Sequence, residues 1–337
     1  MQRILVINVN WLGDVIFSGP VFKALKRQFP AARVACLAVP RVREILEMIP
    51  AVDEVILYDE RGAAGTPWAK WALIRSLRKR NFDAAFLLHR SLTRALLVYL
   101  AGIPVRVGQD AKGRGFLLTH KVVPLPATAH RCDHYLNVVE SFGVKVEDRV
   151  CDLKVDAVAQ EQMEAILAPK NVARNDELIL LNPGGNWDLK RWPRGNFIDL
   201  AYQLNRKFPG KVIVSGSAQD KDLPAAICRK GGQRCVDLSG QLNLKQLVAL
   251  MRRVRVVVSA DSGPLHLANA VGTSVVGLFG PTRPEVTGPR GRGKIRILQK
   301  DVGCNRSPCY NLACPDNVCM QSIGVEEVLH EVFALRN

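Results

Sequence analysis

The sequence of 337 residues lacks any uninterrupted apolar run of about 18 residues, the length that a membrane-spanning helix requires. The N-terminal stretch MQRILVINVNWLGD has neither the long apolar segment nor the small-residue cleavage site of a signal peptide. Short-period repeats and low-complexity tracts are also missing. These absences argue against an integral membrane protein or a repeat array, and we expect a soluble, cytosolic chain.

Aromatic residues make up only 6% of the chain, and no basic stretch carries interleaved Phe or Tyr of the kind that stacks on bases. Acidic residues are outnumbered as well, with 31 Asp and Glu against 47 Lys and Arg and a net charge of +16. Such a charge attracts anionic partners, including phosphorylated sugars and acidic membrane surfaces. Nucleic acid is the weakest of these candidates, and we expect no nucleic-acid partner.

What the sequence does contain is an alternation of short apolar runs with longer segments of helical spacing. The strand-like runs of the first half are RILVINV, RVACLAV, DEVILY, FDAAFLLH and VRVGQ. Those of the second half are ELILLNPGG, KVIVSGSAQ, RCVDLSG, RVRVVVSADSG, TSVVGLFGP and KIRILQK. This alternation is typical of a parallel sheet wrapped by helices, and the length suits two cores of roughly 150 residues each.

The alternation loosens between residues 111 and 155, where loops surround one helical segment, HRCDHYLNVVESFG. We therefore predict an α/β fold of two Rossmann-like, doubly wound domains, residues 1–160 and 161–322. The final helical segment, within residues 323–337, is expected to pack back on the first domain.

In open parallel sheets, ligands bind beyond the carboxyl ends of the strands, where loops lead into helices. Gly13 and Asp14 follow the first strand-like run, and Pro20 suits the early part of the next helix. Asp14 is therefore a candidate general base, with capping of the helix N-terminus as the alternative.

Two loops of the second half contain candidates for nucleotide binding. In LNPGGNWDLKRWP, Gly184 and Gly185 let backbone N–H groups approach an anion, and Lys190 adds positive charge. The alternative is an ordinary glycine turn with solvated basic residues. In VSGSAQDKDLP, Asp220 or Asp222 either accepts hydrogen bonds from ribose hydroxyls or caps the following helix.

The stretch SADSGPLHLAN ends a strand-like run abruptly. Ser262 and Gly263 expose N–H groups at a helix N-terminus, which suits a diphosphate, and Pro264 fits the first helical turn. His266 lies one turn further on, where it is either packed in the core or in contact with a ligand. Asp261 would repel a phosphate unless its carboxylate faces something else, such as a sugar hydroxyl.

Four of the nine cysteines are evenly spaced in CNRSPCYNLACPDNVC, at Cys304, Cys309, Cys314 and Cys319. Reduced structural thiols are the first interpretation, because cytosolic reductants keep thiols reduced. A tetrahedral zinc site and disulfides are the alternatives, although the uniform spacing differs from the paired ligands of zinc sites. We expect no bound metal.

Several motifs occur together, in order, over nearly the whole chain: NWLGDVIFSGP, AGIPVRVG, KRWP, GSAQD and SADSGPLHLANAVGTSVVGLFGPT. In this combination the chain resembles glycosyltransferase family 9, and most closely its ADP-heptose:lipopolysaccharide heptosyltransferases of type II. The resemblance implies two facing Rossmann-like domains of the GT-B type, with the lipid-linked acceptor on the first and the nucleotide sugar on the second. It also implies an enzyme that transfers heptose from ADP-heptose with inversion.

Carried over by position, the resemblance makes Asp14 the catalytic base and Lys190 the diphosphate-binding lysine. The contacts to the donor sugar and its phosphates fall on three consecutive residues, Asp261, Ser262 and Gly263. Asp220 falls near the acid expected at the ribose, whereas the role of His266 stays open. A fixed cation and a helix N-terminus can take the place of a metal, so we expect no cofactor and no divalent ion.

The basic surplus predicts contact with an anionic acceptor. Lys112, Arg114, His120 and Lys121 lie in the loop region of the first domain. The resemblance implies an acceptor made of lipopolysaccharide core and lipid A, rich in phosphate and carboxylate, which these cations would meet. Solvated surface charge is the alternative. The same charge should hold the enzyme loosely on the cytoplasmic face of the inner membrane.

Other functions stay open at this point. A related GT-B glycosyltransferase or an epimerase would keep the fold and use another nucleotide sugar. A non-catalytic nucleotide-sugar-binding protein would have no need for the acid at Asp14.

Overall fold

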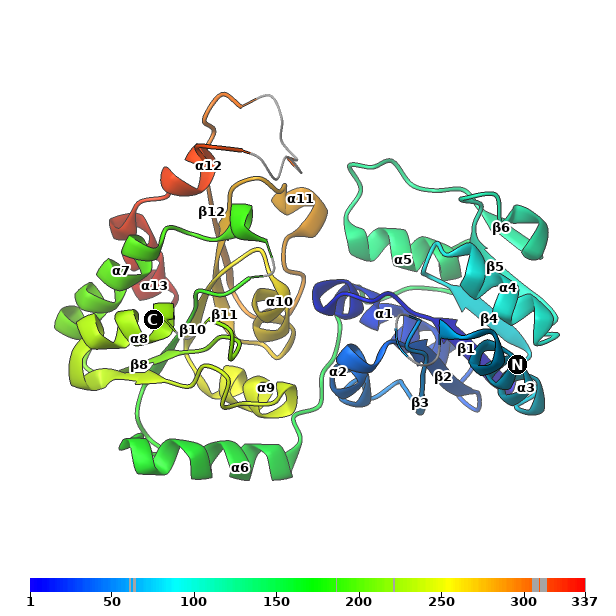
Figure 1. Ribbon diagram of the computed structural model, residues 1–337, viewed down its shortest axis with the longest axis horizontal. Coiled ribbons are helices and arrows are strands. Elements are labelled where there is room, and N and C mark those ends of the chain that lie inside the picture. Colours follow the sequence, from blue (N-terminus) through cyan, green and yellow to red (C-terminus); the bar gives the residue numbers. More distant parts are fainter. Residues whose placement is uncertain are drawn as a thin grey trace. The chain divides into compact units, whose positions relative to one another are not determined.

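The computed structural model describes residues 1–60, 62, 65–185, 187–220, 222–304, 309 and 314–336. The chain forms two compact units, Met1–Lys154 and Val155–Asn337. Each unit is a six-stranded sheet with helices on both faces (Figure 1). This architecture confirms the predicted pair of doubly wound α/β domains, and the boundary after Lys154 falls slightly earlier than the predicted residue 160.

The sheet of the first unit has the strand order β3-β2-β1-β4-β5-β6, and every neighbouring pair is parallel. Its strands are β1 (Arg3–Ile7), β2 (Arg33–Ala38), β3 (Glu54–Leu57), β4 (Ala84–Leu87), β5 (Val105–Gln109) and β6 (His120–Val122). Because β1 pairs with both β2 and β4, the direction of winding reverses there. Open α/β sheets bind ligands at the carboxyl side of such a reversal.

Helices cover both faces of this sheet (Figure 1). They are α1 (Leu12–Gln28), α2 (Arg43–Glu47), α3 (Pro67–Lys79), α4 (Leu92–Leu100) and α5 (Arg131–Glu140), with the short 3-10 helices η1 (Pro40–Val42) and η3 (Gly115–Leu117). α1 packs on α5, and α3 packs on α4. The hydroxyls of Thr66 and Ser91 cap α3 and α4 by accepting from the N–H groups of Ala69 and Arg94.

The sheet of the second unit has the order β12-β11-β10-β7-β8-β9 and is again parallel throughout. Its strands are β7 (Leu178–Asn182), β8 (Lys211–Val214), β9 (Cys235–Asp237), β10 (Val256–Ala260), β11 (Ser274–Phe279) and β12 (Ile295–Gln299). The central strands β7 and β10 are buried along their whole length, which explains their continuous apolar runs. The winding reverses between these two strands.

The helical elements of the second unit also lie on both faces of its sheet (Figure 1). They are α6 (Ala157–Leu167), η4 (Ala168–Lys170), η5 (Asp188–Lys190), α7 (Arg194–Lys207), α8 (Asp222–Gly231), η6 (Gly232–Arg234), α9 (Leu244–Arg253), α10 (Gly263–Ala270), α11 (Pro284–Thr287), α12 (Val318–Gln321) and α13 (Val325–Arg336). Among the helices described in the two units, none is long and apolar enough to cross a bilayer.

The C-terminal helix α13 differs from the sequence-based expectation. It packs on α7, β10 and β11, and its Val328 and Val332 belong to the core of the second unit. Trp192 ties the segment before α13 to the same unit, because its indole N–H donates to the carbonyl of Ile323 at 2.9 Å. The prediction that this helix packs on the first domain is therefore wrong, since its apolar side chains complete the second core.

The first unit corrects two local predictions. His120 and Lys121 belong to β6 and not to a loop; β6 pairs only with β5, and polar residues suit such an edge strand. α1 begins at Leu12, so Pro20 lies in its interior and not in its early part. Gly19 precedes this proline, and the Sγ of Cys151 occupies the space that a side chain there would need.

Candidate active site

In the second unit, Asp261 organises a cluster of polar side chains at the carboxyl edge of the sheet. It directly follows β10, and only 4% of its side chain is exposed. Its Oδ2 accepts from Lys190 Nζ at 2.7 Å and from the hydroxyls of Thr282 and Thr287 at 2.7 and 3.2 Å. His266 Nε2 lies 3.4 Å from Oδ1. Both carboxylate oxygens therefore face protein groups.

Asp261 stays ionised despite its burial. Burial alone would raise the pKa of this carboxyl, but the hydrogen bond with His266 and the positive charge of Lys190 outweigh that effect and hold the pKa well below its usual range. The sequence suggested a sugar hydroxyl as the partner of this acid. In the structure its partners are Lys190, His266 and two threonines, so the negative charge beside the predicted anion site is neutralised from within the protein.

Lys190 reaches this cluster from η5, in the loop that follows β7. Its Nζ lies 2.7 Å from Asp261 Oδ2 and 5.5 Å from the centroid of the Trp187 ring. The side chain is mostly buried, with 23% exposed. A lysine ammonium has three N–H donors, so contact with Asp261 leaves donors that can bind an anion.

Ser262, Gly263 and Pro264 form the start of α10, and all three are half-buried. Ser262 is the N-cap residue, but its side chain does not cap the helix; its Oγ lies 3.0 Å from Ser259 Oγ. Pro264 lies in the first turn, as predicted from its missing N–H. The positive end of the helix dipole therefore lies next to the residue that follows β10.

A buried polar network lies next to the start of α10, and the sequence did not predict it. Asn182, the last residue of β7, accepts from Ser215 Oγ at 3.1 Å and donates to Ser259 Oγ at 3.2 Å. These bonds join the ends of β7, β8 and β10, where the loops of the site begin. A polar residue at the last position of an apolar strand was the signal available for Asn182.

The structure brings Asp220 next to the Gly184–Gly185 loop. A side chain at Gly184 would place its Cβ 3.1 Å from Asp220 Oδ2. The glycine therefore leaves room for the Asp220 carboxylate beside this loop. Arg191 links the two loops, because its guanidinium donates twice to the carbonyl of Gly185 and lies 3.6 Å from Asp220 Oδ1. Asp222, the alternative acid, is exposed in the first turn of α8.

In the first unit, Asp14 lies in the first turn of α1 and is half-buried. The N-cap residue of α1 is Trp11, so Asp14 does not occupy the capping position that was its alternative. Its Oδ1 accepts a hydrogen bond of 2.8 Å from the hydroxyl of Tyr135 on α5. Tyr135 was not singled out from the sequence, because it lies on a helix remote from Asp14 along the chain.

Two arginines act on the same corner of the first unit. Burial raises the pKa of Tyr135 well above its usual value, the negative charge of Asp14 adds to this, and the charges of Arg131 and Arg90 oppose it. Arg90 is exposed and Arg131 is half-buried. Neither was singled out from the sequence, because each is one isolated cation at the edge of an apolar segment.

His89 follows β4 at the same edge of the sheet. Burial, with the charges of Arg94 and Arg114, lowers the pKa of His89 to about 4. Its Nδ1 accepts from the backbone N–H of Ser91 at 3.1 Å. The imidazole of His89 is therefore neutral at physiological pH, because burial and the neighbouring cations disfavour its protonated form.

Arg114 does not lie on the surface where the sequence predicted it. The residue is fully buried, and its guanidinium donates to the carbonyls of Gln109 at 3.0 Å and His89 at 2.5 Å. Burial lowers its pKa to about 10, so it stays charged at neutral pH. It joins the segments that follow β4 and β5, whereas Lys112 is exposed in the left-handed region with φ of 54°.

Among the residues that the structure describes, the evenly spaced cysteines Cys304, Cys309, Cys314 and Cys319 form no disulfide. Most of the residues between Cys304 and Cys314 lie outside the described residues. Within the described part of the chain, no three or more His, Cys, Asp or Glu side chains are grouped so that they could hold a metal ion.

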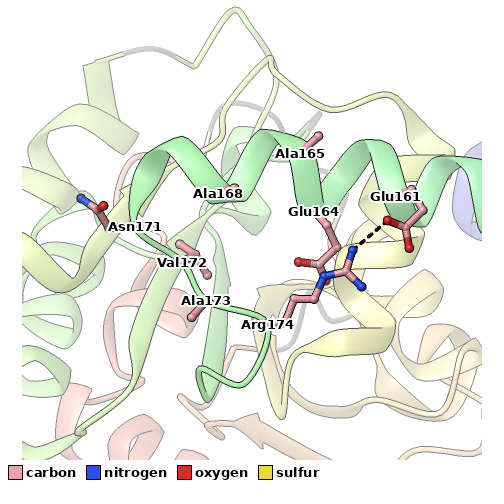
Figure 2. Close-up of a pocket in the computed structure, with 8 residues that line it drawn as sticks. All are labelled: Glu161, Glu164, Ala165, Ala168, Asn171, Val172, Ala173 and Arg174. Carbon is pink, nitrogen blue, oxygen red and sulfur yellow. Dashed lines mark hydrogen bonds and ion pairs between the residues drawn. The ribbon is translucent and has the colours of Figure 1, made fainter.

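A pocket of about 580 Å³ lies away from these residues, between α6, η4 and the segment that leads to β7 (Figure 2). Its lining residues are Glu161, Glu164, Ala165, Ala168, Asn171, Val172, Ala173 and Arg174. Arg174 pairs with Glu161 at 2.8 Å, and Glu164 pairs with Arg253 at 3.4 Å. The pocket contains no predicted site residue, and the one cation in its lining, Arg174, is already paired.

The second unit thus holds a lysine against a buried aspartate beside a helix N-terminus, and the first unit holds a half-buried carboxylate on α1. The model of glycosyltransferase family 9 (heptosyltransferase) matches residues 70–315. The chain belongs to glycosyltransferase family 9. As a member of family 9 it is a glycosyltransferase, which confirms the resemblance seen in its motifs.

Known proteins similar to this family 9 chain cover it almost completely. Lipopolysaccharide heptosyltransferase 2 of Salmonella typhimurium is 28% identical over 345 residues, which are 99% of this chain and 98% of that protein. The structure of ADP-heptose lps heptosyltransferase II from E. coli is 27% identical, covers 99% and 98% of the two chains, and has a TM-score of 0.82. A family 9 structure from Veillonella parvula, 22% identical over 99% and 97%, has a TM-score of 0.87 and shows the same fold.

Proposed function

We propose that this glycosyltransferase moves a heptose from ADP-heptose to the inner core of lipopolysaccharide, on an acceptor of the heptosyl-Kdo-lipid A type. The names of the similar proteins support the donor and the acceptor class. The observation that carries the proposal is the hydrogen bond between Tyr135 and the half-buried carboxylate of Asp14. A protein that only binds a nucleotide sugar has no need for a held, accessible carboxylate in its other unit.

The second unit binds the donor in this proposal. The diphosphate lies between Lys190 and the first turn of α10, where Ser262 and Gly263 supply backbone N–H groups. Asp220, beside Gly184, accepts from the ribose hydroxyls. As the bond between the anomeric carbon and the phosphate oxygen breaks, negative charge grows on ADP, and Lys190 with the helix dipole stabilises it.

The first unit binds the acceptor, and Asp14 is the general base. Its carboxylate takes the proton from the acceptor hydroxyl while that oxygen forms a bond to the anomeric carbon. The electron pair of the broken bond leaves with ADP, so a single displacement inverts the configuration. The anomeric carbon is oxocarbenium-like at this point, and the hydroxyl attacks from the face opposite ADP.

Exposed cations of the first unit meet the anionic core of the acceptor. The charges of Arg90 and Arg131 act on Tyr135, and Lys112 is exposed on the sequence-predicted loop, where its charge acts on His89. The buried Arg114 joins the segments after β4 and β5 through its hydrogen bonds to the carbonyls of His89 and Gln109, and it does not contact the acceptor. Because the acceptor is a lipid, the enzyme works at the cytoplasmic face of the inner membrane as a peripheral protein.

Transfer needs no divalent ion or other cofactor in this proposal. The ammonium of Lys190 and the N-terminus of α10 supply positive charge at the leaving diphosphate. A chelator should therefore leave the rate of ADP release unchanged. Loss of activity with chelator and its return with magnesium would contradict this part of the proposal.

The test of the proposed function is ADP release from ADP-heptose, measured with and without a Kdo-lipid A acceptor that carries one heptose. Acceptor-dependent release of ADP, with one heptose added to the acceptor, is expected. Tight binding of ADP-heptose without release would indicate a binding protein. Turnover with another nucleotide sugar would indicate a related transferase, and conversion of the sugar without acceptor would indicate an epimerase.

A further inference from the structure

The outer face of α3 carries aromatic side chains where a surface helix of a soluble domain would carry polar ones. Trp68 is 84% exposed and Trp71 is 50% exposed, while Ile74 and Leu77 face the core. Ala72 and Arg75 continue the exposed row, so these residues share one face of the helix by their spacing of three and four. Tryptophan is a highly buried residue on average, so two exposed ones on one face indicate a contact.

The neighbouring helix α4 extends this face. Leu92, Leu96 and Tyr99 are exposed along it, at spacings of four and three residues. The two helices pack together (Figure 1). The guanidinium of Arg78 on α3 donates to the carbonyl of Leu100 at 2.7 Å. Phe116 of η3, which packs on α4, is 76% exposed. Trp68, Trp71, Leu92, Leu96, Tyr99 and Phe116 are called the α3–α4 apolar surface below.

The two helices that form most of this surface carry charges of one sign. α3 contains Lys70, Arg75, Arg78 and Lys79 and no acidic residue, and α4 contains no acidic residue either. Arg106 lies over the ring of Tyr99 at 5.3 Å. The sequence between Glu60 and Asp110 contains one carboxylate, Asp83, which accepts from the N–H groups of Gln2 and Arg3. Exposed apolar groups on helices that carry cations and no carboxylate suit an anionic, amphiphilic surface.

One end of the α3–α4 apolar surface lies at the carboxyl edge of the first sheet, where Asp14 also lies. α3 follows β3 and α4 follows β4, so both helices begin at the carboxyl edge of the parallel sheet. Trp68 and Leu92 are in the first turns of these helices, and Phe116 follows the loop after β5. Asp14 lies in the first turn after β1, at the same edge. A bilayer that contacts this surface therefore borders the edge where the proposed base lies.

We propose that the α3–α4 apolar surface docks on an anionic bilayer, with its aromatic rings in the headgroup region and its cations against lipid phosphates. The proposal rests on the proposed function in one respect, that the acceptor is a membrane lipid. Tryptophan and tyrosine favour the interface between water and hydrocarbon, because their rings are apolar and their N–H and O–H groups are polar. A second copy of this chain is a poor occupant, because symmetric pairing would bring Arg75, Arg78 and Lys79 against like charges.

The experiment measures binding of the full chain to phosphatidylcholine vesicles with and without phosphatidylglycerol. The wild type should bind only the vesicles with phosphatidylglycerol, and salt should weaken the binding. Replacing both tryptophans (Trp68→Ala with Trp71→Ala) should lower the vesicle partition coefficient by roughly tenfold or more, because two interfacial rings are lost. Charge reversal at Arg75 and Lys79 should lower it by about fivefold or more for each cation.

Matched substitutions in the second unit serve as controls. Tyr202→Ala removes an exposed ring, and Arg229→Glu reverses an exposed charge on α8. Both should bind vesicles like the wild type. The double tryptophan variant should keep wild-type ADP release with a detergent-dissolved acceptor and lose it with the acceptor embedded in vesicles. That contrast excludes misfolding as the cause.

Wild-type vesicle binding by the double tryptophan variant would overturn the proposal. A concentration-dependent dimer that this variant abolishes, with vesicle binding unchanged, would assign the surface to contact between copies and overturn it as well. Failure of the wild type to act on dissolved acceptor would contradict the proposed function instead. Vesicle binding does not require catalysis, so its measurement would still test the docking proposal.

Discussion

The two units share one strand order but hold their central acids differently. Counted along each unit, both sheets run 3-2-1-4-5-6, and in open sheets of this kind ligands bind at the carboxyl edge. In the first unit, Asp14 is half-buried and accepts from one tyrosine hydroxyl. In the second, Asp261 is buried and faces Lys190, His266, Thr282 and Thr287.

Two carboxylates at equivalent edges of the same kind of sheet therefore differ in solvent exposure and in hydrogen-bond partners, and these differences suit them to different roles. The low pKa of Asp261 and its ion pair with Lys190 make it a poor proton acceptor, and in the proposed mechanism it positions Lys190 and His266. Asp14 is only partly buried, which suits the general base that we propose it to be. Substitutions at the two acids should therefore fail in different ways.

The largest effect is expected from Asp14→Asn. The amide keeps the shape of the carboxylate but cannot take the acceptor proton, so kcat should fall by roughly a thousandfold. The affinity for ADP should stay at the wild-type value, because Asp14 lies in the other unit from the proposed donor site. Steady-state kinetics and ADP titration measure the two quantities, and a near-normal kcat would return Asp14 to a structural role.

The next effect is a loss of stability in Asp261→Asn. Lys190 would be left without its charged partner, which costs about 3 kcal/mol for a mostly buried pair. The pKa of Asp261 is lowered by folding, so its contribution is fully present above the unfolded value of about 3.9 and is lost only as the pH falls through the lower folded value. The difference in unfolding free energy from the wild type should therefore be constant between about pH 5 and pH 8.

Denaturant unfolding at several pH values checks this second expectation. A difference that shrinks well above pH 5 would mean that Asp261 takes up a proton in that range and is not held ionised by Lys190 and His266.

A slightly smaller effect is expected from Lys190→Ala. Loss of the ammonium should weaken ADP binding and lower kcat/KM by about a hundredfold, since one stabiliser of the leaving diphosphate disappears. Isothermal titration with ADP and steady-state kinetics are the measurements. Arg194→Ala, an exposed cation at the start of α7, is the control and should bind ADP normally. Normal ADP binding by Lys190→Ala would put the diphosphate elsewhere.

The smallest effect is expected from Tyr135→Phe. Losing one hydrogen bond to a half-exposed carboxylate should lower kcat by about tenfold, or about 1.4 kcal/mol. KM for both substrates and the unfolding transition should change little, because the ring and its packing remain. A wild-type kcat in this variant would show that Asp14 needs no partner on α5 to be held in place.

Much of the fold could be predicted from the sequence, because the central strands are continuous apolar runs and their helices have clear spacing. The same regularity located Asp261, Lys190 and Asp220 on loops of one sheet edge. In the structure Asp261 and Lys190 form an ion pair, and Asp220 lies beside Gly184. β6 was missed because an edge strand of three residues, two of them polar, has no apolar pattern. The place of Pro20 in its helix was predicted wrongly, because a proline in a helix interior is uncommon.

The rest of the site depends on contacts between distant segments. Tyr135 meets Asp14 from 121 residues away, and no local pattern marks it. Arg114 stands in a polar stretch, KGRGF, that looks solvated, yet it folds inward to satisfy carbonyls after β4 and β5. The partners of Asp261 include Thr282 and Thr287, which follow β11 and become neighbours only when β10 and β11 pair.

The most direct test of the different roles proposed for Asp14 and Asp261 measures kcat and the ADP dissociation constant side by side for Asp14→Asn and Asp261→Asn. The account predicts that Asp14→Asn loses kcat and keeps its ADP affinity, whereas Asp261→Asn loses ADP affinity together with kcat because Lys190 is no longer held. Weakened ADP binding in Asp14→Asn with normal binding in Asp261→Asn would contradict it.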